Sequence, residues 1–430
     1  MQHPGVDAAQ AWTPRRLLWG GLVALSWLTA PGARAQVAAL PQESPLSPRS
    51  GSRPAPPPSP DPSIDQPATE LPRETPIENS LTRGLSSASG SAFGGYGELV
   101  LSLPSNAASV VDLRRVVFFF GHDFSDTLRF YSELEVEHAV ASFSDKGEVD
   151  VEQAYLDWLF TKRLNLRGGL ILMPAGIINI YHEPPSFFAV DRPDVDLLII
   201  PSTWSEPGVG LFGELTEGLR YQLYVVNGLN ANRFSAQLSV GESKQEASLA
   251  YGGDVGVIGR IDYEPILGAV FGATAYGGTS GNTLTASIGQ VPVALFDVDA
   301  RARHRGWTAR FEAAMLLVWN TAALDLVVPG APVSRVSWGG YAELGYDLFH
   351  WWLPNLGQEL NLFGRLDAVD TQADVPQGFT PDRAGRRLSG TMGFSYKPIP
   401  QIALKLDDRL QTFGAGASFD QLDTAITWLF

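Results

Sequence analysis

Apolar and polar residues alternate along most of the chain beyond residue 94. In the segment 128–137, Leu128 and Phe130 fall on one face of an extended chain, and Glu133 and Glu135 fall on the other. The same alternation recurs in three later segments: 307–315, 360–367 and 402–407. Because successive side chains of a β-strand point to opposite faces, this pattern predicts strands with one apolar and one polar face.

Three features favour a transmembrane β-barrel over a soluble β-sandwich, whose strands also alternate. The predicted strands reach about ten residues, the length that a tilted bilayer crossing needs. Tight connections, such as 161–163 and 304–306, alternate with long ones, such as 174–205 and 229–253. Aromatic residues lie near strand ends, as membrane interfaces favour. We expect an all-β fold, a transmembrane antiparallel β-barrel of about 16 strands with an inward-folded third loop, the strands being 94–103, 110–121, 126–137, 151–160, 163–173, 207–215, 218–228, 254–263, 268–277, 293–303, 306–317, 336–347, 358–369, 386–397, 400–411 and 419–430.

The first 90 residues differ from the rest of the chain. Arg15 and Arg16 precede an apolar run at 17–30, and Ala33-Arg34-Ala35 has the small-x-small pattern of a cleavage site. We therefore expect a signal peptide at 1–35, because the apolar run is short for a membrane anchor. Proline is frequent in 36–90, and such a segment buries too little apolar surface to fold, so a disordered periplasmic tail is expected before a barrel at 91–430.

Charge and composition exclude several classes of function. The chain has 46 acidic and 31 basic residues, a net charge of −15, so no nucleic-acid partner is expected. It has no cysteine, which excludes disulfides, thiolate metal sites and cysteine nucleophiles. No two histidines have the spacing of metal ligands, so neither a metal site nor a cofactor is expected.

Several short motifs lie between residues 110 and 215: Asp112-Leu113-Arg114-Arg115, Leu128-Arg129-Phe130, Ala154-Tyr155-Leu156-Asp157-Trp158, Leu166-Arg167-Gly168-Gly169, Pro174-Ala175-Gly176, Phe187-Phe188, Asp191-Arg192-Pro193 and Gly208-Val209-Gly210. With these motifs the segment resembles the phosphate-selective porin O and P family of outer-membrane porins. The resemblance implies a third loop that narrows the pore, a homotrimer, and transport of phosphate or another anion. One position departs from the family: Leu172 stands where a lysine is common.

The third loop is expected to carry the pore constriction, at Tyr181, His182, Glu183, Asp191, Arg192, Asp194 and Asp196. Acidic residues outnumber basic ones in this set, and acidic rings favour cations whereas the resemblance implies anions, so the sequence leaves the selectivity open. Charged strand positions are expected on the lumen wall, at Arg114, Arg129, Glu133, Glu135, Arg310, Glu312, Arg365, Asp367 and Lys405. For any single one of them, pairing within a polar interior is the simpler interpretation. Of the adjacent Arg114 and Arg115, only one is expected to point inward.

The last strand ends in alternating apolar residues and a terminal phenylalanine, with Ile426, Trp428 and Phe430 on one face. This ending resembles the insertion signal of outer-membrane proteins. It predicts recognition by the barrel assembly machinery and residence in the outer membrane, in contact with the lipid bilayer and lipopolysaccharide.

These patterns predict a passive porin for small hydrophilic solutes. The alternative is a structural barrel without an open pore that anchors the envelope through the segment 36–90. An enzyme is the third hypothesis, but no motif places a nucleophile beside a base, so no catalytic residue is assigned. The segment 208–213 matches GxGxxG, yet it opens a strand and precedes no helix, so it does not indicate a dinucleotide site.

Overall fold

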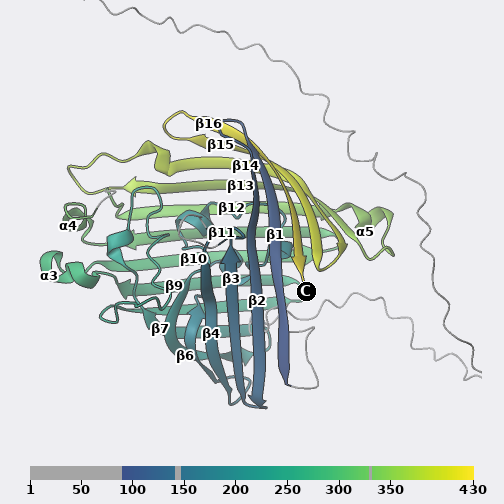
Figure 1. The fold of residues 1–430 in the computed structure, drawn as a ribbon, viewed down its shortest axis with the longest axis horizontal. Coiled ribbons are helices and arrows are strands. Elements are labelled where there is room, and N and C mark those ends of the chain that lie inside the picture. Colours follow the sequence, from purple (N-terminus) through teal and green to yellow (C-terminus); the bar gives the residue numbers. More distant parts are fainter. Residues whose placement is uncertain (1–89, 141–146, 329–331) are drawn as a thin grey trace, which may run out of the picture. The chain divides into compact units, whose positions relative to one another are not determined.

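The computed structural model describes residues 90–140, 147–328 and 332–430. The predicted signal peptide and all but the last residue of the predicted tail lie outside these ranges. Sixteen antiparallel strands form one closed barrel, in which each strand pairs with its neighbours in the chain and β1 pairs with β16 (Figure 1). The expected fold is therefore confirmed, including the number of strands.

The strands are β1 (Ser91–Pro104), β2 (Val110–Ser125), β3 (Leu128–Glu137), β4 (Val149–Leu159), β5 (Asn165–Leu172), β6 (Ser205–Thr216), β7 (Leu219–Asn227), β8 (Val255–Ile266), β9 (Ala269–Thr279), β10 (Pro292–His304), β11 (Trp307–Val318), β12 (Val336–Asp347), β13 (Glu359–Asp374), β14 (Arg386–Ile399), β15 (Ile402–Phe413) and β16 (Ser418–Leu429). Short helices lie in the connections: α1 (Ile177–Ile180), η2 (Pro184–Ser186), α2 (Val195–Leu198), η3 (Ala231–Arg233), η4 (Asn282–Leu284), α3 (Thr285–Ile288), α4 (Thr321–Leu324), α5 (Leu348–Trp352) and η5 (Arg383–Gly385). Within the described ranges, no helix is long and apolar enough to cross a membrane.

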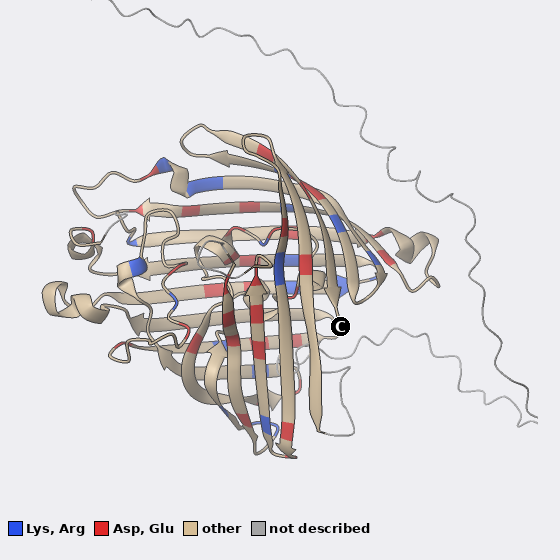
Figure 2. Cartoon of the chain, viewed as in Figure 1, with Lys and Arg blue, Asp and Glu red and all other residues tan. Residues whose placement is uncertain are grey.

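The two faces of the sheet differ sharply in chemistry. On β13, Arg365 and Asp367 point inward and are 2% and 1% exposed, whereas their neighbour Leu366 points outward and is 67% exposed. Figure 2 shows the charged residues as separate bands along strands that are otherwise uncharged. An apolar outer surface around a polar interior is the reverse of a soluble protein and is typical of a transmembrane barrel.

The connections alternate in length, as expected, with exceptions. At one end of the barrel the turns are short: Arg305 and Gly306, with φ of 48° and 82°, form a two-residue hairpin turn between the paired residues His304 and Trp307. The β12–β13 connection at this end is an exception, because it is longer than the short turns predicted here and contains helix α5, which has no buried residue. The longer loops lie at the other end (Figure 1).

A β-bulge in β2 corrects the expectation for the adjacent arginines. In the β1–β2 ladder Glu98 pairs with Arg115 and Leu99 pairs with Leu113, so Arg114 is an extra residue. Such an insertion changes the side-chain alternation, and both Arg114 and Arg115 point into the lumen. The prediction that only one of them faces inward is therefore wrong, because it assumed an unbroken period of two.

The second bulge lies in β4. Here Glu133 pairs with Gln153 and Leu134 pairs with Val151, which leaves Glu152 as the extra residue. As a result the consecutive residues Glu152 and Gln153 are both buried inside the barrel, each 3% exposed. Both bulges coincide with two consecutive polar residues, Arg114-Arg115 and Glu152-Gln153, that interrupt the alternation of the sequence.

Two long connections fill the lumen. The connection between β5 and β6, here called the inward loop (173–204), folds inside as expected, and its Ile199 and Ile200 are fully buried. The connection between β7 and β8 (228–254) also folds inward, which the sequence did not predict: the carbonyl of Ala236 accepts hydrogen bonds from Thr371 (3.1 Å) and Gln372 (3.2 Å).

Candidate pore constriction

The inward loop is attached to the barrel wall through its own backbone. The Thr274 hydroxyl on β9 donates to the carbonyl of Pro174 (2.9 Å). On β11, Glu312 accepts from the backbone N–H of Ile177 (3.0 Å), and Arg310 donates to the carbonyl of Ser186 (2.7 Å). Inward polar side chains on these strands therefore satisfy a loop backbone that water does not reach.

The same kind of attachment continues on β13 and β15. Lys405 donates to the carbonyl of Ala189 (2.8 Å), and Arg365 donates to that of Asp191 (3.0 Å). Asp367 accepts from the backbone N–H of Asp194 (3.1 Å). Five of the residues expected on the lumen wall thus hold the loop: Arg310, Glu312, Arg365, Asp367 and Lys405.

Asp194 makes the densest set of contacts in the loop. Its carboxylate accepts hydrogen bonds from Ser389 (2.9 Å), Gln411 (3.1 Å) and the guanidinium of Arg409. Asp194 itself is 2% exposed. Its contacts with β14 and β15 therefore form a buried tether in the middle of the loop.

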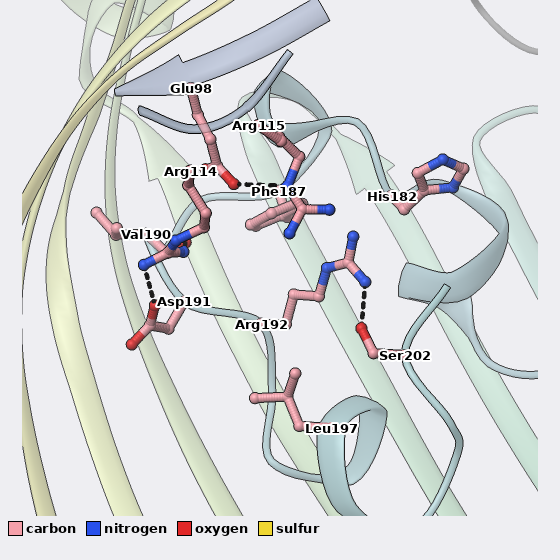
Figure 3. A pocket seen from close by; sticks show the side chains of 10 residues that line it. All are labelled: Glu98, Arg114, Arg115, His182, Phe187, Val190, Asp191, Arg192, Leu197 and Ser202. Carbon is pink, nitrogen blue, oxygen red and sulfur yellow. Dashed lines mark hydrogen bonds and ion pairs between the residues drawn. The ribbon is translucent and has the colours of Figure 1, made fainter. Parts of the chain in front are cut away.

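A cavity of about 240 Å³ lies between β1, β2 and the inward loop. Three arginines line it, Arg114, Arg115 and Arg192, and Figure 3 shows the guanidinium of Arg114 directed toward Asp191. Arg114 pairs with Asp191 (2.9 Å), and Arg115 pairs with Glu98 (3.1 Å). A volume of this size holds several water molecules or one small, partly hydrated ion.

Arg192 differs from the other two arginines in its partners. Its guanidinium donates to the hydroxyls of Ser202 and Thr203 (3.0 Å to Thr203), and within the described residues it makes no ion pair. One of its terminal nitrogens, Nη2, is buried without a hydrogen-bond partner. Burial and the positive charge of Arg115 lower the pKa of Arg192. The cavity therefore contains one guanidinium that forms no ion pair with a carboxylate of the described residues.

An acidic group lies under the first turn of the loop. A Cβ added at Gly176, whose φ is 76°, would lie 2.6 Å from Glu312 Oε1 and 2.9 Å from Asp196 Oδ1. Only glycine fits there, both sterically and in backbone conformation. Burial raises the pKa of Asp196 to about 7, although nearby Arg192 lowers it. This loop carboxyl therefore titrates near neutral pH.

His182 and Glu183 face the opposite side of the barrel and are 1% and 5% exposed. The Nε2 atom of His182 lies 3.7 Å from a carboxylate oxygen of Glu133 and 3.7 Å from one of Glu152. Burial by itself lowers the pKa of His182, but the interactions with these two glutamates outweigh it and hold the pKa well above its usual value. The Tyr181 hydroxyl instead accepts a hydrogen bond from the guanidinium of Arg301 on the wall (2.6 Å).

The structure thus brings together all seven predicted loop residues inside the barrel, with Glu133, Glu135 and Arg114 beside them. Arg129 is not part of this group, since it lies at the end of β3, is 45% exposed and pairs with the exposed Asp123 (3.2 Å). On β16, Ile426 and Phe430 are 49% and 51% exposed on the outer surface, as the predicted insertion signal requires.

Sequence reasoning missed several residues of the site. Glu98 and Glu152 were not singled out, and Arg115 was expected to point away from the lumen if Arg114 pointed inward. A further buried group on β8 and β10 was also missed: Arg260 lies 2.8 Å from Asp262 and 2.7 Å from Asp299. Alternation places these residues on an inner face, but partners on other strands, such as Asp299 on β10, depend on register.

Comparison with known proteins agrees with the architecture. No protein-family model matches the chain, so the resemblance to the phosphate-selective porin O and P family is not confirmed. OmpF of Salmonella typhi, solved with daunomycin, aligns with a TM-score of 0.56 at 14% identity, over 80% of this chain and 99% of that one. The outer-membrane channel DcaP of Acinetobacter baumannii gives 0.53 at 12% identity, over 81% and 99%. An anion-selective porin from Comamonas acidovorans gives 0.51 at 10% identity, over 79% and 99%. At these identities the likeness concerns the fold alone.

One relative is similar in sequence as well. A protein of Aquifex aeolicus (strain VF5), described as uncharacterized, is 34% identical over 354 residues, which cover 79% of this chain and 80% of that protein. The chain, a closed barrel with the fold of outer-membrane porins, therefore belongs to the same family as this Aquifex aeolicus protein.

Proposed function

We propose that the chain is an outer-membrane porin, a passive channel for small hydrophilic solutes. The observation that carries this proposal is a closed sixteen-strand barrel that is apolar outside and charged inside, with one long loop fastened across its lumen. Such a barrel satisfies every backbone group of its strands without water, which a lipid environment demands. Sixteen strands enclose a lumen rather than a packed core. The proposal includes no catalytic step.

We propose further that the constriction favours small anions, phosphate or another. The whole chain is acidic, but charges act across only about 8 Å at physiological ionic strength. The groups that line the narrow cavity therefore determine which ions pass. There, Arg114 and Arg115 have acidic partners whereas Arg192 has none among the described residues. A ring of basic side chains favours anions in a pore.

The test is conductance of the protein, purified from membranes, in a planar bilayer with a KCl gradient. Stable current steps and a reversal potential of the sign for chloride are expected. Arg192→Gln should shift the reversal potential toward cation preference, whereas the control Arg129→Gln, at the exposed end of β3, should leave it unchanged. Cation preference of the parent, or no shift in Arg192→Gln, would overturn the selectivity. No conductance from a barrel shown to be folded would overturn the channel.

A second candidate function is a barrel without an open pore that anchors the envelope. It is favoured by the lumen itself, which two loops fill so closely that Phe234 and Ile199 are at most 1% exposed. Under this candidate the chain conducts no current but retains peptidoglycan in a pull-down. The segment 36–90, which would make that contact, lies outside the described residues except for Gly90.

Assembly follows from the same proposal. The segment 1–35 would direct export, and the barrel assembly machinery would read Ile426, Trp428 and Phe430 before insertion beside lipopolysaccharide. The outward position of Ile426 and Phe430 supports this, because a recognition signal must be accessible. A homotrimer is implied by the family resemblance, and cross-linking in native membranes tests it.

A further inference from the structure

Three potential metal ligands from separate parts of the chain meet beside the cavity. Glu133 lies on β3, Glu152 on β4, and His182 follows α1 in the inward loop. One ligand atom from each lies within 4.8 Å of those from the other two. All three side chains are about 1% exposed, so the group is protected from bulk solvent.

The fold departs from regularity to form this group. Glu152 is the extra residue of the β4 bulge; counted from the inward Tyr155 and Asp157, a regular strand would place it on the outer face of the barrel. Bulges commonly redirect a side chain next to a functional site. His182 comes from the inward loop, where it lies two residues beyond the end of α1.

The surrounding hydrogen bonds orient the three side chains. His182 Nδ1 lies 3.1 Å from the carbonyl of Asn179, which only accepts, so Nδ1 carries a proton. Nε2 is thus the position available to a metal ion, which would displace the proton there; it is buried, makes no hydrogen bond within the described ranges, and lies 3.7 Å from a carboxylate oxygen of each glutamate. A metal-bound histidine typically donates its other ring N–H to a carbonyl in this way.

The carboxylates are oriented as well. Gln153 and Tyr131 each donate to Glu133 at 2.6 Å, and the Tyr96 hydroxyl lies 3.3 Å from Glu152 Oε2. Partners of this kind fix the direction of a ligating carboxylate. They are neutral groups, so they orient Glu133 and Glu152 without cancelling their negative charge.

The local charge calls for a cation. Glu133 and Glu152 each have a carboxylate oxygen 3.7 Å from His182 Nε2, whereas Arg115 pairs with Glu98 (3.1 Å) and Glu135 (3.4 Å). Among the described residues no guanidinium forms an ion pair with Glu133 or Glu152, so these two carboxylates are open to a cation.

We propose that Glu133, Glu152 and His182 bind a divalent transition-metal ion, with Zn²⁺ the best match. Histidine nitrogen and carboxylate oxygen are both zinc ligands, and three protein ligands leave a fourth position for water. Two zinc bonds of about 2.05 Å at the tetrahedral angle separate their donor atoms by about 3.3 Å. The two observed distances of 3.7 Å therefore need to contract by a few tenths of an ångström, and the two carboxylate oxygens, which lie within 4.8 Å of each other, by at most about 1.5 Å. His182 also lines the cavity, through which the ion enters.

The test measures bound metal and does not depend on conductance. The full chain, freed of lipopolysaccharide and treated with EDTA in detergent, is dialysed against buffered micromolar zinc at pH 7.5, and bound zinc is counted by elemental analysis. One zinc per chain is expected. His182→Gln, Glu133→Gln and Glu152→Gln should each weaken binding by about tenfold or more. The matched control His304→Gln, at an exposed strand end, should bind as the parent does.

Resistance of the folded barrel to SDS before heating establishes that each variant folds. Cobalt gives a second readout, because visible absorption from a four- or five-coordinate site should appear in the parent and in His304→Gln and be lost in His182→Gln. Less than half an equivalent of zinc in the folded parent overturns the proposal. Unchanged binding in folded His182→Gln overturns it too, since the zinc then lies elsewhere.

Discussion

Asp194 holds the middle of the inward loop against β14 and β15, and replacing it should detach the loop without unfolding the barrel. Asp194→Asn keeps the size of the side chain but removes its charge. It also turns amide N–H donors toward Gln411 and Arg409, which are donors themselves. Losing one partner of a buried ion pair costs about 3–5 kcal/mol.

The detached state of this part of the loop should therefore become roughly 10² to almost 10⁴ times more populated relative to the attached state. The barrel keeps its sixteen-strand ladder, so its resistance to SDS should not change. Hydrogen exchange of the backbone amides in 187–200 should accelerate, and open-channel current noise should increase. The matched control is Asp123→Asn, because the Asp123–Arg129 pair is half exposed and such pairs contribute about 0–1 kcal/mol.

Equal exchange rates in Asp194→Asn and the parent would show that the other attachments suffice and that the tether has no separate role. A loss of SDS resistance would show that loop and barrel form one cooperative unit. Either result would refute the reasoning that a loop inside a hydrogen-bonded barrel opens independently of it.

Three further predictions concern other parts of the molecule. Burial raises the pKa of Asp196 to about 7, so its negative charge appears as the pH rises through 7. The preference of the channel for anions, measured by the reversal potential, should therefore fall between pH 6 and pH 8. Asp196→Asn should abolish this change. Because of the same raised pKa, the contribution of Asp196 to the free energy of unfolding is greatest below about pH 4 and declines by at most about 1.4 kcal/mol per pH unit up to pH 7. The free energy of unfolding in urea should therefore decrease less steeply with pH in Asp196→Asn than in the parent. Gly97→Leu should prevent closure of the barrel between β1 and β16, since a Cβ at this position would lie 2.6 Å from the indole of Trp428, and SDS resistance should be lost. The control Gly364→Leu should retain SDS resistance, because a Cβ there has nothing within 4 Å. Leu366→Arg, on the outer face of β13, should lower stability in lipid vesicles by about 2–4 kcal/mol, whereas Leu249→Arg, in a fully exposed loop position, should leave it unchanged; equal stability of the two variants would argue against a lipid-facing surface.

The candidate site was only partly predictable from the sequence. The length and apolar content of the 174–205 connection predicted a loop packed inside, and the seven residues selected from it do lie there. The roles of the wall residues were not predictable. Arg310 and Lys405 are inward as alternation requires, but whether they face water or bind a loop carbonyl depends on where the loop runs.

Local patterns alone determined the sixteen strands, the apolar outer face and the tight turn at Arg305 and Gly306, because side-chain alternation and turn conformation depend on residues a few positions apart. The bulges at Arg114 and Glu152, the inward 228–254 connection and the partners of each lumen charge were decided by the folded barrel. Their contacts join residues far apart in the chain, such as Asp194 and Gln411, which are separated by 217 positions. The consecutive polar residues Glu152 and Gln153 interrupt the alternation, but the sequence pattern does not say which residues they face, so the Glu133, Glu152 and His182 group exists only once strand register and loop path are set.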